Sequence, residues 1–210
     1  MPLTNDQIAR YSRQIIIPNM GGQAQERLLS SRIVVISSRE DLEEPLSYLV
    51  GAGVGEIDLC VPGTDDARLR ALCDKMRNLN PDSTVRYGSF AQVPDLVFVL
   101  LGSAEAVQFA AAEAPATGAA VVARLDAPEK IALLPSPPPC IRCVSGGLLE
   151  SFGARSDHAG VVAMLATTEV VKILAAYDTN AGASLLRFDG LRMAAEPVAS
   201  SNPHCGCAHA

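Results

Sequence analysis

A repeated change between short apolar runs and amphipathic stretches marks the first part of the chain. Residues 32–36 form a β-branched apolar run, residues 45–50 have helical spacing, glycines follow at 51–55, and residues 57–61 alternate between apolar and polar side chains. Such runs predict a strand, a helix that ends at the glycines, and a second strand. Residues 32–61 therefore predict a βαβ unit, which commonly begins a nucleotide-binding sheet.

The same kinds of pattern predict helices and strands on either side of this unit. Thr4 and Gln7 fit the capping box of a helix over residues 5–15, and a second helix over 23–29 leads into the first strand. The later elements are expected in this order: a helix at 65–78, a strand at 84–87, a buried strand at 95–101, an alanine-rich helix to about 114, a buried strand at 119–123, a long helix from 159, and strands at 185–189 and 193–198.

The turn after the first strand is unusual for a phosphate-binding loop. Residues 37–44 read SSREDLEE, with no glycine and with four carboxylates. Glycine lets backbone N–H groups approach a phosphate at a helix N-terminus. Carboxylates about 4 Å from a triphosphate would repel it by several kcal/mol at an effective dielectric near 20. The turn raises the hypothesis of a nucleotide-binding fold that has lost its nucleotide.

Composition narrows the classes of partner. The chain of 210 residues is 49% hydrophobic and carries a net charge of −6, with 4% aromatic residues and no tryptophan, so a nucleic-acid surface is not expected. The N-terminus lacks the apolar core of a signal peptide. Glu169 and Lys172 interrupt the most apolar helical stretch, which argues against a membrane span. We expect a cytoplasmic protein of one α/β domain.

Two cysteine pairs predict a metal site. A CxxC loop combined with a distant second pair is typical of structural zinc with four thiolates and no open position for catalysis, and these pairs are Cys140 with Cys143 and Cys205 with Cys207. His204 or His209 could replace one of these cysteines. Two alternatives are reduced thiols without metal and a CxxC redox or sulfur-relay site. Cys60 and Cys73 fall within a predicted strand and helix, which favours ordinary buried thiols.

Several separate stretches together carry a family resemblance. They are RYSRQI at residues 10–15, the segment 22–29, AGVG at 52–55, Asn80-Pro81, the Cys140/Cys143 pair, and NPHC at 202–205. With this combination, nearly the whole chain resembles the ThiF/MoeB/HesA family of ubiquitin-activating-enzyme-like adenylyltransferases. The resemblance implies a dimeric protein whose relatives use Mg-ATP to adenylate the C-terminal glycine of a small ubiquitin-like sulfur carrier.

The resemblance also implies an architecture. We expect a single domain over residues 1–210, with N-terminal helices at 1–31, a Rossmann-like core at 32–134 and a zinc-stapled C-terminal part at 135–210. The sheet is expected to be mostly parallel, with helices on both faces and antiparallel C-terminal strands.

Most of the family's ATP-site residues have no equivalent here. The glycine loop of the family falls on Ser37, Arg39, Glu40 and Leu42, and the ribose-binding acid falls on Val61. A downstream segment with an Asn-Leu and an Arg-Gln pair is absent, and the magnesium-binding aspartate falls near residue 102. The loop that bears the acceptor cysteine is shortened to residues 153–158, which contain none. We therefore expect that ATP and magnesium are not bound.

Two arginines match family positions. Arg13 corresponds to the arginine that reaches the partner subunit's ATP phosphates, and Arg68 lies where the family places a phosphate-binding lysine. Arg13 could instead pair with an acid on the second helix, and Arg68 could belong to a solvated basic stretch. His158 lies in the shortened loop without a neighbouring nucleophile and is expected at the surface.

These observations favour a pseudoenzyme that binds or supports a catalytic homologue, or a ubiquitin-like sulfur carrier, without its own ATP chemistry. It would act as a homodimer or as a heterodimer with a ThiF/MoeB-like protein. The alternative is an active adenylyltransferase with a rearranged phosphate site in which Arg39 and Arg68 neutralise the triphosphate. A CxxC redox or sulfur-relay protein is a third hypothesis.

Overall fold

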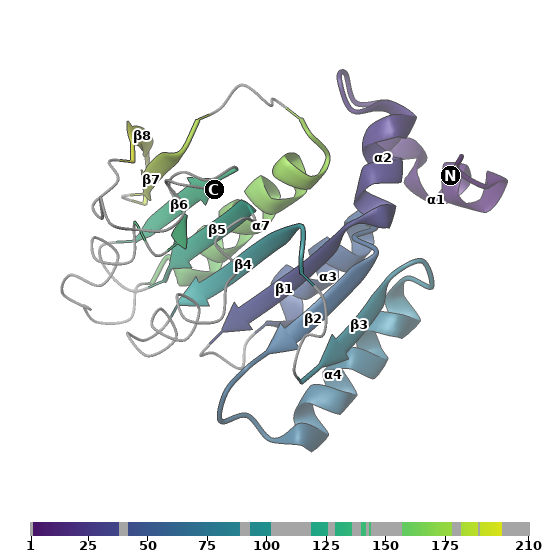
Figure 1. Cartoon of the computed structure of the whole chain (residues 1–210), viewed down its shortest axis with the longest axis horizontal. Coiled ribbons are helices and arrows are strands. Elements are labelled where there is room, and N and C mark those ends of the chain that lie inside the picture. Colours follow the sequence, from purple (N-terminus) through teal and green to yellow (C-terminus); the bar gives the residue numbers. More distant parts are fainter. Residues whose placement is uncertain are drawn as a thin grey trace.

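The computed structural model describes residues 2–37, 42–88, 93–101, 119–125, 129–135, 140, 141, 143, 157–177, 182–188 and 190–198. Within them one sheet has the strand order β3-β2-β1-β4-β5-β6-β7-β8 (Figure 1). The strands are β1 (Arg32–Ser37), β2 (Glu56–Cys60), β3 (Thr84–Tyr87), β4 (Leu96–Leu101), β5 (Ala119–Arg124), β6 (Lys130–Leu134), β7 (Ser184–Phe188) and β8 (Met193–Pro197). The helices are α1 (Asn5–Ile15), α2 (Gly21–Ser30), α3 (Glu43–Ala52), α4 (Asp66–Leu79) and α7 (Ala159–Leu174).

The sheet is parallel through β5 and antiparallel from β5 to β8. β1 pairs in parallel with both β2 and β4, so that Ile33 lies between Ile57 and Leu96. The chain leaves β1 toward β2 on one side and later returns to β4 on the other. This reversal makes a topological switch point at the carboxyl ends of β1 and β4, where ligands commonly bind in such sheets. The predicted mixed α/β sheet is confirmed.

The two faces of the sheet bury separate apolar clusters. Along β1, Ile33 and Val35 join a cluster with residues of α2, α3, α4 and α7, whereas Val34 and Ile36 join a second cluster with Cys140, Ile141 and Cys143. Alternation along a strand sends successive side chains to opposite faces, and a strand buried on both faces therefore reads as a continuous apolar run. The alanine-rich helix expected before residue 114 lies outside the described residues.

A buried polar cluster attaches α1 to the sheet. Tyr11 is 1% exposed, and its hydroxyl donates to Asp82 Oδ2 at 3.1 Å and accepts from Asn80 Nδ2 at 2.8 Å. Asn80 Nδ2 also donates to the carbonyl of Val50 at 2.7 Å. Arg10 Nε lies 3.1 Å from Asp82 Oδ2, so the same carboxylate receives a charge as well as hydrogen bonds. We call Arg10, Tyr11, Gln25, Gly53, Asn80 and Asp82 the N-terminal anchor.

Gly53 completes this anchor from the end of α3. It ends the helix with φ +88°, and a Cβ there would lie 2.7 Å from Gln25 Nε2 and 2.8 Å from Tyr11 Cζ. Gln25 is fully buried and donates from Nε2 to the carbonyl of Ala52 at 3.0 Å. Glycine is required because the backbone is left-handed and because the side chains of α1 and α2 occupy the space of a Cβ.

Three element predictions differ from the structure. The strand β6 was not predicted, because its short apolar run leads directly into the proline-rich segment. α2 begins at Gly21, so the glycine pair starts the helix and does not precede it. α3 begins two residues before Pro45, because Glu43 and Glu44 suit the positive end of a helix and proline is tolerated in its first turn.

Among the described residues, none of the helices has the length and apolarity needed to cross a bilayer.

Candidate functional site

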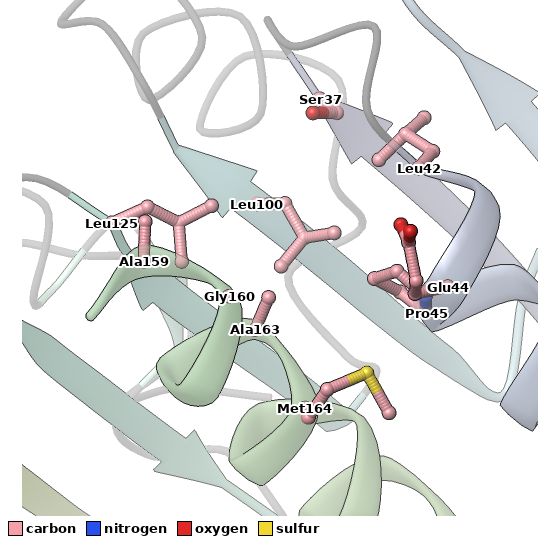
Figure 2. A pocket seen from close by; sticks show the side chains of 10 residues that line it. All are labelled: Ser37, Leu42, Glu44, Pro45, Leu100, Leu125, Ala159, Gly160, Ala163 and Met164. Carbon is pink, nitrogen blue, oxygen red and sulfur yellow. The ribbon is translucent and has the colours of Figure 1, made fainter. Parts of the chain in front are cut away.

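A cavity of about 430 Å³ lies at the switch point, beside the carboxyl ends of β1 and β4 (Figure 2). The first turns of α3 and α7 form its other walls. We call it the switch-point cavity, and the described residues that line it are Ser37, Leu42, Glu44, Pro45, Leu100, Leu125, Ala159, Gly160, Ala163 and Met164. Among these, Glu44 carries the only formal charge. The lining offers a triphosphate no cation among the described residues.

The first turn of α3 is poorly suited to binding an anion. Its first two residues, Glu43 and Glu44, are carboxylates, and its third residue, Pro45, has no N–H. Free N–H groups and the helix dipole make an N-terminus attractive to phosphate. Here two acids already use that positive end, and proline removes one of the donors. Residues 38–41, which hold Arg39 and Glu40 of the predicted loop, lie outside the described residues.

A second cavity of about 440 Å³ lies between the first turn of α3 and α4. Val61, the residue that follows β2, lines it and is 7% exposed. An isopropyl side chain cannot accept a ribose hydrogen bond. Arg68 and Lys75 also line this cavity, and Lys75 Nζ pairs with Glu43 Oε1. The structure thus brings Arg68 to the edge of the expected nucleotide region. The surface there contains both basic and acidic side chains.

Arg13 lies elsewhere. It is exposed in the last turn of α1, and α1 and α2 sit beyond the amino ends of the central strands, whereas the switch-point cavity lies at their carboxyl ends (Figure 1). The expected alternative, an ion pair with an acid on α2, is not found among the described residues. Arg13 therefore does not contribute to the site of its own chain.

The two cysteines of the first predicted pair lie close together in the structure. Cys140 and Cys143 are 2% and 1% exposed, and their Sγ atoms lie 3.9 Å apart, too far for a disulfide. Two thiolates about 2.3 Å from a tetrahedral zinc would be separated by about 3.8 Å, so this pair fits one edge of such a site. Cys205, Cys207, His204 and His209 lie outside the described residues, and the part that is described contains no group of three metal-binding side chains.

Of the other two cysteines, Cys73 is buried as predicted and Cys60 is only partly buried. Cys73 is fully buried in α4, and burial raises the pKa of its thiol. Cys60 ends β2 and is partly buried against the second apolar cluster. Neither takes part in a disulfide.

His158 precedes α7 and is exposed, as predicted, but it is also held in place. Its ring meets that of Phe188 edge-on with centroids 5.7 Å apart, and its Nδ1 lies 3.5 Å from Glu129 Oε1. These contacts join α7 to the antiparallel part of the sheet. Sequence patterns missed them because the three residues are far apart in the chain.

The mixed sheet with a cavity at its switch point defines a Rossmann-like α/β protein. Solved structures agree: Escherichia coli MccB with ATP superposes with a TM-score of 0.68 over 94% of this chain and 73% of that chain, at 14% identity. That likeness shows the fold. No family model matches the sequence.

Sequence relatives resemble this chain in part or at low identity. A 57-residue stretch, 27% of this chain, is 47% identical to the adenylyltransferase and sulfurtransferase MOCS3 of Drosophila willistoni, and it spans only 12% of that protein. Protein HesA, vegetative, of Trichormus variabilis is 27% identical over 218 residues, which cover 88% of this chain and 82% of HesA. These likenesses support the resemblance of the chain to the ThiF/MoeB/HesA family.

Proposed function

We propose that this chain is a pseudoenzyme of the ThiF/MoeB/HesA family, which supports a catalytic homologue or docks a ubiquitin-like sulfur carrier without ATP chemistry of its own. The observation that carries the proposal is the first turn of α3. It presents Glu43, Glu44 and Pro45 where a phosphate would need N–H groups and positive charge. Buried Val61 supports it on the ribose side.

Arg13 and the surface around it support a role in a dimer. Ile8, Ile16 and Ile17 of the N-terminal segment are 47%, 78% and 43% exposed, and Arg13 lies between them in sequence. Exposed apolar side chains near an unused cation are typical of an interface. In our proposal Arg13 reaches the ATP phosphates of a catalytic partner, where an arginine stabilises the charge of the transferring group.

The test is carrier-dependent pyrophosphate exchange by a catalytic ThiF/MoeB-like homologue that copurifies with this chain. Alone, the chain is expected to give no exchange. Added to the homologue, the wild-type chain should raise the exchange rate. The increase caused by the Arg13→Ala variant should be at least about tenfold smaller, which is within the usual effect of a trans arginine. Arg70→Ala, at another exposed helical arginine on α4, is the control. Exchange by the chain alone would contradict the proposal and favour the alternative active enzyme.

Zinc belongs to the same proposal. Cys140 and Cys143 would supply two ligands, and the metal would stabilise the fold by joining the chain near β6 to the C-terminal pair. Cys140→Ser should lower both the zinc content and the melting temperature, whereas Cys73→Ser should change the zinc content little. A Cys140→Ser protein that keeps one zinc per chain and melts like the wild type would contradict a structural metal.

A further inference from the structure

The switch-point cavity has a lining that suits a different class of ligand from a nucleotide. Its walls are mainly aliphatic: Leu42, Pro45, Leu100 and Leu125 from the strand ends and α3, with Ala163 and Met164 from α7. The volume of about 430 Å³ falls within the range of small-molecule pockets, which are mostly apolar with a few placed polar groups.

The polar groups at the cavity determine which kind of polar end a bound molecule could have. Figure 2 shows the carboxylate of Glu44, an exposed residue that lines both cavities, directed toward the space between Leu42 and Leu100. Glu43, its neighbour, is instead paired with Lys75 on the side of the second cavity. A carboxylate accepts hydrogen bonds and repels an anion. The N-terminus of α7, near Gly160, has partial positive charge and works in the opposite direction, but its half charge is smaller than the full charge of Glu44.

We propose that the switch-point cavity binds a small, mainly aliphatic molecule whose head group is a hydrogen-bond donor and not an anion. This inference rests on the proposed function, because a cavity that took up ATP would not be free for such a ligand. An alcohol or an amine would place its donor on Glu44 and its chain against the apolar wall.

The experiment uses three probes with the same six-carbon chain: 1-hexanol, hexylamine and hexanoate. The readout is the ε-methyl NMR signal of Met164 in full-length protein labelled at methionine methyls, with Met193 on β8 as a reference far along the sheet. We expect 1-hexanol and hexylamine to shift the Met164 signal in a saturable way and hexanoate to bind at least about tenfold more weakly. Equal binding of hexanoate, or no saturable shift with any probe, would overturn the inference.

Two pairs of variants locate the effect. In the Glu44→Gln variant, the affinity for 1-hexanol relative to hexanoate should fall by about tenfold. In Glu43→Gln, the matched control, this ratio of affinities should be unchanged. Gly160→Leu should abolish probe binding, because a Cβ at Gly160 has no heavy atom within 4 Å and the side chain enters open space beside the cavity. Gly51→Leu, in equally open space on α3, is its control and should bind normally. If Gly160→Leu bound the probes like the wild type, the cavity would not be their site.

A Mg-ATP titration on the same sample separates the two proposals. A saturable Met164 shift with Mg-ATP would contradict the proposed function. Failure of the three probes without any ATP shift would overturn this inference alone.

Discussion

The N-terminal anchor and the switch-point cavity lie toward opposite ends of the central strands and differ in how their polar groups are used. In the anchor, Tyr11, Asn80 and Asp82 bond to one another and to the backbone, and Gly53 leaves room for them. At the switch-point cavity, the exposed residue Glu44 and the buried residue Ser37 lie beside aliphatic side chains. Five of the six anchor residues lie in the stretches that carry the family resemblance, and the contacts of the anchor hold α1, α2 and α3 together without any ligand. Such a resemblance therefore reports the fold and does not by itself report ATP chemistry.

The largest expected effect is at Gly53. Gly53→Ala should lower the free energy of unfolding by about 2–4 kcal/mol, because it combines a left-handed backbone with overpacking against Gln25 and Tyr11. Gly51→Ala, two residues earlier in open space, should be neutral or stabilise by up to about 1 kcal/mol. Urea denaturation of both variants measures the difference. Similar stabilities would show that the anchor does not constrain the fold as described.

A pH-dependent effect on the order of 2–3 kcal/mol is expected at Tyr11. Burial raises the pKa of its hydroxyl from 10.0 to about 12, with Asp82 contributing in the same direction and Asn80 opposing. The folded state therefore holds this proton more tightly than the unfolded state. Its contribution is complete below about pH 10 and is lost as the pH rises to about 12.

Urea denaturation between pH 9 and about 12 tests this, with Tyr11→Phe as the control that lacks the proton. The variant should be less stable than the wild type at neutral pH, because Asn80 loses an acceptor. The stability difference between the two proteins should then shrink through the alkaline range. A constant difference would mean that Tyr11 does not titrate in this way.

The smallest effect is expected at the first turn of α3. The double variant Glu43→Gln, Glu44→Gln should lower the free energy of unfolding by about 1–2 kcal/mol or less, because each acid interacts with the helix dipole at an exposed position. It should also fail to bind Mg-ATP, since Pro45 and Val61 remain. Chemical denaturation and a binding titration measure the two outcomes, and gain of ATP binding would show that the acids alone block the site.

The sequence predicted the features whose signals are local. The capping box at Thr4, the strands of the βαβ unit and the adjacency of Cys140 and Cys143 each follow from residues a few positions apart. It did not predict the features that need tertiary contacts. Asn80 and Tyr11 are 69 residues apart, and no periodicity in the chain signals that they meet. The apolar lining of the switch-point cavity likewise depends on α7, which packs against α3 although the two helices are far apart in the chain.

The central claim is that the switch-point region does not bind ATP, and a thermal melt with and without millimolar Mg-ATP tests it most directly. A ligand at about 100 times its dissociation constant stabilises the folded state by roughly 2.7 kcal/mol, which raises the melting temperature visibly. The same midpoint is expected in both samples. A clear magnesium-dependent increase would contradict this claim and would mean that the acidic first turn of α3 accommodates a triphosphate.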